Sequence, residues 1–138
     1  MEFGYDKISE GTPLVTKGSI IQFSNELCGT SLKLKEIHLH TTNQSEHELT
    51  DKCVWEISSV YDHLLEGMLG ITDSKLEFNS IKPIIPESAD VVELLKTLKK
   101  KADSLNTYIC HSEFAQLENL LDEFIDNLNK YIYLARNS

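Results

Sequence analysis

The sequence is poor in proline, glycine and cysteine, and it has no long hydrophobic run. It contains three prolines, six glycines and three cysteines in 138 residues. No 18-residue apolar stretch is present, so we expect no membrane span. The first residues lack the basic start and apolar centre of a signal peptide. Three cysteines without a Cys-x-x-Cys spacing do not make a disulfide framework, which favours a reducing, cytoplasmic location.

Positive charge is also scarce, because 13 lysines and arginines face 22 aspartates and glutamates, for a net charge of −9. The overall field of such a chain does not attract it to phosphate backbones. The one lysine cluster, within residues 96–101, is interpreted as a solvated face, so direct DNA binding is not expected. Glycine-rich phosphate loops and nucleophile motifs are absent, which excludes the common kinase and hydrolase designs.

What remains is a helical pattern over a single domain, residues 1–138. After an N-terminal tail, residues 1–16, apolar side chains recur at helical spacing in four segments. These segments predict helices over 17–40, 46–69, 89–104 or somewhat beyond, and 112–136. Ser45, with Glu48 three residues later, predicts a capping box at the start of the second helix, and Gly70 predicts its end.

A long aperiodic connection, residues 70–88, separates the two helical pairs and contains two of the three prolines. Such a connection cannot continue a helix, although it is apolar enough to pack on one. Two helical pairs joined by one long crossover favour an all-α, ferritin-like four-helix bundle over an up-down bundle with short loops.

The second predicted helix carries one histidine and three carboxylates on one face. His47, Asp51, Asp62 and Glu66 share a strip about 100° wide, away from the apolar stripe. Trp55 lies within this strip, which indicates that the face is buried against another subunit. Buried carboxylates would cost several kcal/mol each unless a cation lay between them. The alternative is an ordinary solvated face, although such faces usually mix lysine or arginine among the acids.

His38 ends the apolar stripe of the first predicted helix and adds a second imidazole close to His47 in sequence. A single histidine in that position is more often a hydrogen-bonded core residue than a ligand. Two histidines with three carboxylates, however, form a mixed nitrogen and oxygen donor set that suits iron, manganese or zinc.

These residues resemble a known family. The segment from Leu32 to His40, a short polar turn, and the spacing His47-x3-Asp51-x10-Asp62-x3-Glu66 are similar to the ferroxidase signature of the Dps branch of ferritin-like proteins. Residues 120–136 are similar to the last helix of that family. The chain departs from it in a shorter connection between the two histidines and in a leucine where the family has an aromatic residue. This compact form also resembles small phage-encoded ferritin-like proteins of unassigned role.

The resemblance implies an iron-binding protein that oxidises Fe²⁺ with peroxide or oxygen at a two-fold subunit interface. Its implied metal ligands are His38, His47, Asp51, Asp62 and Glu66. The implied catalytic pair is Asp62 and Glu66, and zinc or manganese would fit the same donors. The family also implies a homo-oligomer, with a dimer as its smallest unit and a dodecameric shell as the full assembly. No Glu-x-x-His motif is present, so a diiron site within one subunit is not expected.

The competing interpretation is a non-catalytic helical bundle that assembles or binds partners but has lost iron oxidation. The shortened turn between His38 and His47 favours it, because a displaced histidine would leave only a weak carboxylate site.

Overall fold

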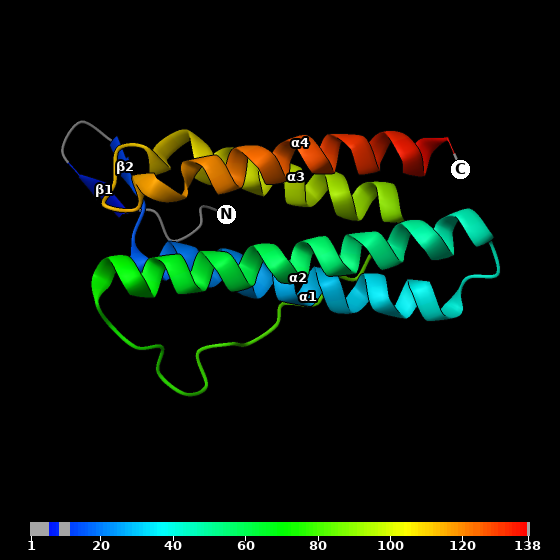
Figure 1. The fold of residues 1–138 in the computed structure, drawn as a ribbon, viewed down its shortest axis with the longest axis horizontal. Coiled ribbons are helices and arrows are strands. Elements are labelled where there is room, and N and C mark those ends of the chain that lie inside the picture. Colours follow the sequence, from blue (N-terminus) through cyan, green and yellow to red (C-terminus); the bar gives the residue numbers. More distant parts are fainter. Residues whose placement is uncertain (1–5, 9–11, 138) are drawn as a thin grey trace.

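Four long helices make up most of the molecule in a computed structural model that describes residues 6–8 and 12–137. They are α1 (Lys17–His40), α2 (Gln44–Thr72), α3 (Val91–Ile109) and α4 (Glu118–Arg136). Figure 1 shows α1 and α2 as one antiparallel pair and α3 and α4 as a second. The pairs pack together with α1 against α3 and α2 against α4. The predicted four-helix arrangement is confirmed at this level.

The first helix has the predicted bounds, and its start is capped by a neighbouring pair of hydroxyl groups. Thr16 Oγ1 accepts a hydrogen bond from the Ser19 amide, and Ser19 Oγ accepts one from the Thr16 amide. This reciprocal pairing satisfies two amides that the first turn leaves without partners.

The second helix is longer than predicted at both ends, and both of its predicted end signals are wrong. Asn43 is the N-cap, since its Oδ1 accepts from the Glu46 amide at 2.9 Å, and Ser45 lies inside the first turn. Gly70 is an ordinary helical residue. The last helical residue is Thr72, and the C-cap Asp73 has a φ of 48°, in the left-handed region.

The third and fourth helices differ from the prediction mainly at their first or last turns. Asp90 caps α3 by accepting from the amides of Val92 and Glu93, and α3 continues beyond residue 104 to Ile109, as the prediction allowed. The predicted last helix begins instead as a short 3-10 turn, Ala115–Leu117, before α4.

Part of the predicted N-terminal tail forms a hairpin that the sequence pattern did not indicate. Strands β1 (Asp6–Ile8) and β2 (Thr12–Leu14) pair antiparallel, and β2 contacts α3. Residues 1–5 and 9–11 of that tail lie outside the described residues.

The connection between α2 and α3, residues 73–90, is irregular and follows α1. The Asn25 side chain donates to the Ser80 carbonyl and accepts from the Lys82 amide at 3.0 Å, while the Asn25 carbonyl accepts from the Ile84 amide at 3.0 Å. Figure 1 shows that the connection runs from one end of the bundle toward the other, so that α2 and α3 point in the same direction.

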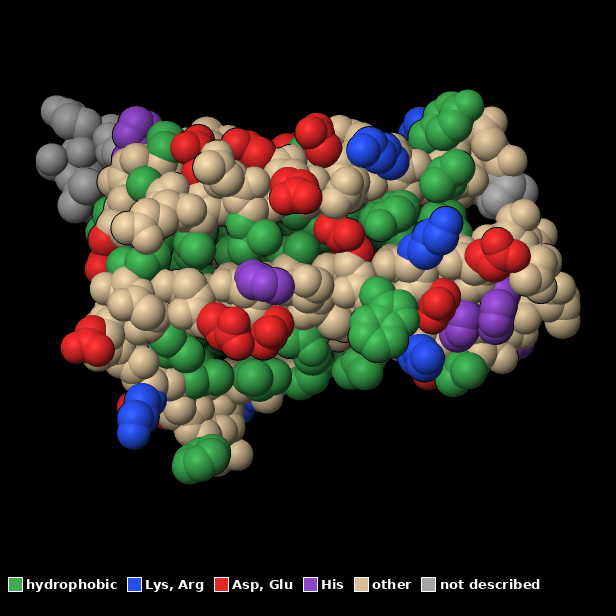
Figure 2. All heavy atoms as spheres, in the orientation of Figure 1, with side chains coloured by type: hydrophobic (Ala, Val, Ile, Leu, Met, Phe, Trp, Pro, Cys, Tyr) green, Lys and Arg blue, Asp and Glu red, His purple; other side chains and the backbone are tan. Residues whose placement is uncertain are grey.

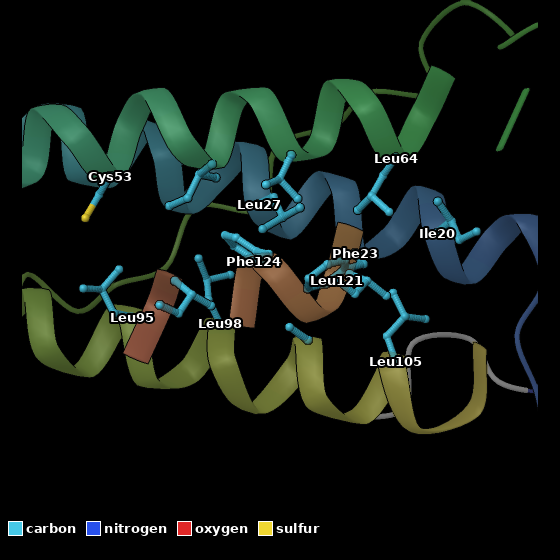
Figure 3. Packing of buried hydrophobic residues seen from close by; sticks show 14 of the residues in the cluster. Ile20, Phe23, Leu27, Cys53, Leu64, Leu95, Leu98, Leu105, Leu121 and Phe124 are labelled. Atoms are coloured by element: carbon cyan, nitrogen blue, oxygen red, sulfur yellow. The ribbon is translucent and has the colours of Figure 1, made fainter. Parts of the chain in front are cut away.

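The core lies between the two helical pairs, where apolar side chains from all four helices point toward one another (Figure 3). The apolar stripe predicted on α2 is confirmed, since its six members are buried: Leu49, Cys53, Ile57, Val60, Leu64 and Met68. None of the described helices combines the length and hydropathy that a bilayer crossing requires.

Candidate metal centre

His38 and His47 lie against each other at the end of the bundle where α1 turns into α2. Their rings are stacked, with centroids 3.9 Å apart and planes 20° apart. A turn of only three residues, 41–43, separates the two helices. Its brevity brings the last turn of α1 directly beside the first turn of α2. The short connection therefore does not separate the two predicted ligands within the chain.

Each histidine is held by the backbone of the other. His38 Nδ1 lies 2.7 Å from the His47 carbonyl oxygen, and His47 Nδ1 lies 3.0 Å from the His38 carbonyl oxygen. A carbonyl only accepts hydrogen bonds, so Nδ1 is the protonated donor in both rings. In the neutral form, both Nε2 atoms then carry a lone pair that a metal ion can use. Metal-binding histidines are commonly oriented by such a hydrogen bond to the backbone.

Thr50 supports this pair and was not recognised in the sequence. It is fully buried, its Oγ1 lies 3.2 Å from His38 Nδ1, and it donates to the Glu46 carbonyl at 2.7 Å. The signal that could have found it is a hydroxyl residue inside an apolar stripe, one helical turn after His47.

The three predicted carboxylates lie along α2 in two places. Asp51 is half-buried one turn after His47, whereas Asp62 and Glu66 are exposed. Because a helix rises 1.5 Å per residue, Asp62 lies about 22 Å beyond His47. None of the three takes part in an ion pair with another described residue.

One chain therefore does not bring the predicted ligands together. Across residues 6–8 and 12–137, no three histidine, cysteine, aspartate or glutamate side chains are placed to share a metal ion. The histidines and Asp51 belong to one end of α2, and Asp62 and Glu66 to its second half. Any site that combines them requires a second copy of the chain.

Trp55 lies on α2 between these two groups and is 72% exposed. Figure 2 shows the surface over α2, where acidic and histidine side chains are interspersed with hydrophobic ones. A tryptophan this exposed beside carboxylates is unusual for a solvated helix face.

A second polar group, also missed in the sequence, joins α2 to α4. Glu56 accepts from Asn127 Nδ2 at 2.9 Å, and Tyr131 Oη lies 3.5 Å from its other oxygen.

Burial raises the pKa of two groups near Glu56, and the negative charge of Glu56 raises both further. The pKa of Cys53 rises to about 12, and the pKa of Tyr131 also rises. Burial also raises the pKa of Tyr61, helped by a hydrogen bond with Cys28. Cys53 is thus an unreactive core thiol.

Comparison of the chain with protein-family models, with curated proteins and with solved structures finds no match.

Proposed function

We propose that this chain is a Dps-like member of the ferritin-like proteins that binds Fe²⁺ between subunits and oxidises it with peroxide or oxygen. The observation that carries the proposal is the pair His38 and His47, whose Nδ1 atoms are both occupied by backbone carbonyls. Two imidazoles with free Nε2 atoms stand at the end of an acidic helix face that has no basic partner among the described residues.

The direction of the helices supports the ferritin-like class. The first antiparallel pair is followed by a long connection along α1 and then by a second antiparallel pair (Figure 1). The first helix of the second pair, α3, runs parallel to α2. This is the topology of bundles with one crossover. The hydrogen bonds between Asn25 and the connection hold this crossover against the bundle.

The spacing along α2 supports a site shared by two copies. His47 and Asp51 are centred on Leu49, and Asp62 and Glu66 are centred on Leu64. The two centres lie about 22 Å apart along one helix.

Antiparallel pairing of two α2 helices about a two-fold axis near residues 56–57 would bring the first centre of one copy to the second centre of the other. Trp55 would then lie beside the axis and would be covered by the mate. This pairing accounts for the exposed tryptophan and the unpaired carboxylates together.

In this site the neutral Nε2 atoms of His38 and His47, with Asp51, would bind Fe²⁺ from one subunit. The carboxylates of Asp62 and Glu66 would bind it from the mate. Anionic oxygen ligands stabilise Fe³⁺ more than Fe²⁺, so they lower the cost of removing an electron. With peroxide, two Fe²⁺ ions each give up one electron, and the peroxide takes two protons to form two water molecules.

One observation favours the alternative of a non-catalytic assembly protein. The stacked rings of His38 and His47, with their reciprocal hydrogen bonds, also satisfy backbone carbonyls at the turn between α1 and α2. A purely structural role of this kind would need no metal.

Iron titration together with mass measurement separates the two functions. The wild-type chain should form a dimer or larger assembly and oxidise Fe²⁺, and the variant Asp62→Asn with Glu66→Gln should lose oxidation while keeping its fold. The matched control is Glu123→Gln with Asp126→Asn, which removes the same charge from two exposed positions on α4. A monomer without iron uptake, or equal activity in both variants, would exclude the proposed site.

A further inference from the structure

A basic groove lies between the first half of α3 and the last turns of α4. The groove has a volume of about 460 Å³. The groove is lined by Lys96, Lys99, Lys100, Asp103, Asn129, Ile132 and Arg136.

The antiparallel packing of α3 and α4 brings these residues together from distant parts of the sequence. Lys96 and Lys100 are one helical turn apart on α3, and Arg136 is in the last turn of α4. The buried side chain of Ile132 lines the groove between them. The sequence alone shows only a lysine run, because Arg136 joins it through the fold.

Basic side chains outnumber acidic ones in the lining of the groove. Asp103 is the one acidic residue in the lining, and it pairs with Lys99 at 3.4 Å. Lys96, Lys100 and Arg136 form no ion pair with any residue of the described part of the chain. On a chain with a net charge of −9, this is a local reversal of sign.

We propose that this groove binds a compact phosphate anion that carries several negative charges, such as a polyphosphate group. Arginine offers a planar fork of donors that matches phosphate oxygens, and lysine offers mobile point charges beside it. The side-chain amide of Asn129 adds a neutral donor.

The lining favours a compact anion over single-stranded nucleic acid. Proteins that bind single strands stack the bases on aromatic side chains, and no aromatic residue lines this groove. The proposal is independent of the iron site, because none of its residues lies on α2.

Calorimetric titration with inorganic tripolyphosphate tests the proposal at low salt. Chelator is present throughout, so that metal binding plays no part in the measurement. We expect the variant Lys96→Gln, Lys100→Gln, Arg136→Gln to bind at least about tenfold more weakly than wild type, since it removes three charge-assisted contacts to the anion. The matched control, Lys35→Gln, Lys75→Gln, Lys82→Gln, removes the same charge from exposed positions elsewhere and should keep most of the wild-type affinity.

Circular dichroism of both variants checks that the fold is retained. Absence of binding to the wild type, or an equal loss in the two variants, would overturn the proposal. Tighter binding of a short single-stranded oligonucleotide than of tripolyphosphate through the same three residues would also overturn it, in favour of a nucleic-acid surface.

Discussion

Gly29 of α1 lies directly against the backbone of Ile84 in the connection between α2 and α3. A Cβ atom built on Gly29 would lie 1.8 Å from the Ile84 carbonyl oxygen. Glycine costs a helix interior about 1 kcal/mol relative to alanine. Here its lack of a side chain is what allows the connection to approach α1.

Alanine at this position should therefore destabilise the protein, although it is the better helix former. We expect Gly29→Ala to lower the free energy of unfolding by about 1–3 kcal/mol, because the backbone of the connection must move away. Gly70→Ala is the control, since nothing lies within 4 Å of a Cβ there, and it should stabilise α2 by up to about 1 kcal/mol. Urea unfolding measures both values, and a change of the same sign in the two variants would contradict the expectation.

The start of α2 gives a second paired prediction. Asn43→Ala removes the oxygen that accepts from the Glu46 amide, and it should cost about 1 kcal/mol. Ser45→Ala changes a residue inside the first turn and should alter stability by less than about 0.5 kcal/mol. Thermal unfolding of the two variants measures the difference. A larger loss in the serine variant would mean that Ser45 is the cap in solution.

These helix ends indicate what the sequence can and cannot predict about the fold. Apolar spacing predicted α1 and the buried stripe of α2, because burial imposes a period of 3.6 residues. The N-cap of α2 was predicted wrongly as Ser45 and is Asn43, because the residue that caps the helix depends on how tightly the turn closes. Gly70 resembled a helix end, but the left-handed residue that ends α2 is Asp73.

The candidate site, like the helix ends, was predicted only in part from the sequence. Residue type and spacing were enough to select His38 and His47, but their reciprocal hydrogen bonds depend on the geometry of the turn. Thr50 was missed because it lies among apolar residues and so resembles a core position. The pairing of these groups with Asp62 and Glu66 of a second copy stays a prediction.

Thr50→Val tests whether the contact to His38 matters for metal binding. Valine keeps the shape of the side chain but removes the oxygen 3.2 Å from His38 Nδ1. Loss of such a supporting group typically weakens metal affinity by about 10–100-fold, which calorimetry with Zn²⁺ would measure. Thr72→Val is the control, because Thr72 makes the same kind of bond to the carbonyl four residues earlier in α2, far from the histidines. Equal affinities in both variants would contradict a supporting role.

Trp55 is the only tryptophan, so its fluorescence reports directly on the proposed pairing of α2 helices. If a second copy covers it, dilution to monomer should shift its emission to longer wavelength. Trp55→Glu should prevent association, because it introduces a charge at the buried centre of the interface. Tyr133→Glu, which changes another exposed aromatic residue on α4, should leave the mass in solution unchanged. An assembly that survives Trp55→Glu would require a different interface.

Alkaline pH should destabilise the protein, because some buried groups have a higher pKa in the folded chain than in the unfolded chain. Burial and the charge of Glu56 raise the pKa of Cys53 from 9.0 to about 12. Well below pH 9 the thiol is protonated in both the folded and the unfolded chain and adds no pH dependence. Between these two pKa values the unfolded chain has lost a proton that the folded chain keeps, so stability falls as pH rises, by at most about 1.4 kcal/mol per pH unit.

The raised pKa values of Tyr61 and Tyr131 act in the same direction at higher pH. Cys53→Ala should therefore show a smaller loss of unfolding free energy between about pH 8 and about pH 10.5 than the wild type does. Cys110→Ala removes an exposed thiol and should keep the wild-type dependence. If both variants lose the same free energy over this range, the alkaline sensitivity does not arise at Cys53, and the two tyrosines packed beside acidic or thiol groups become its source.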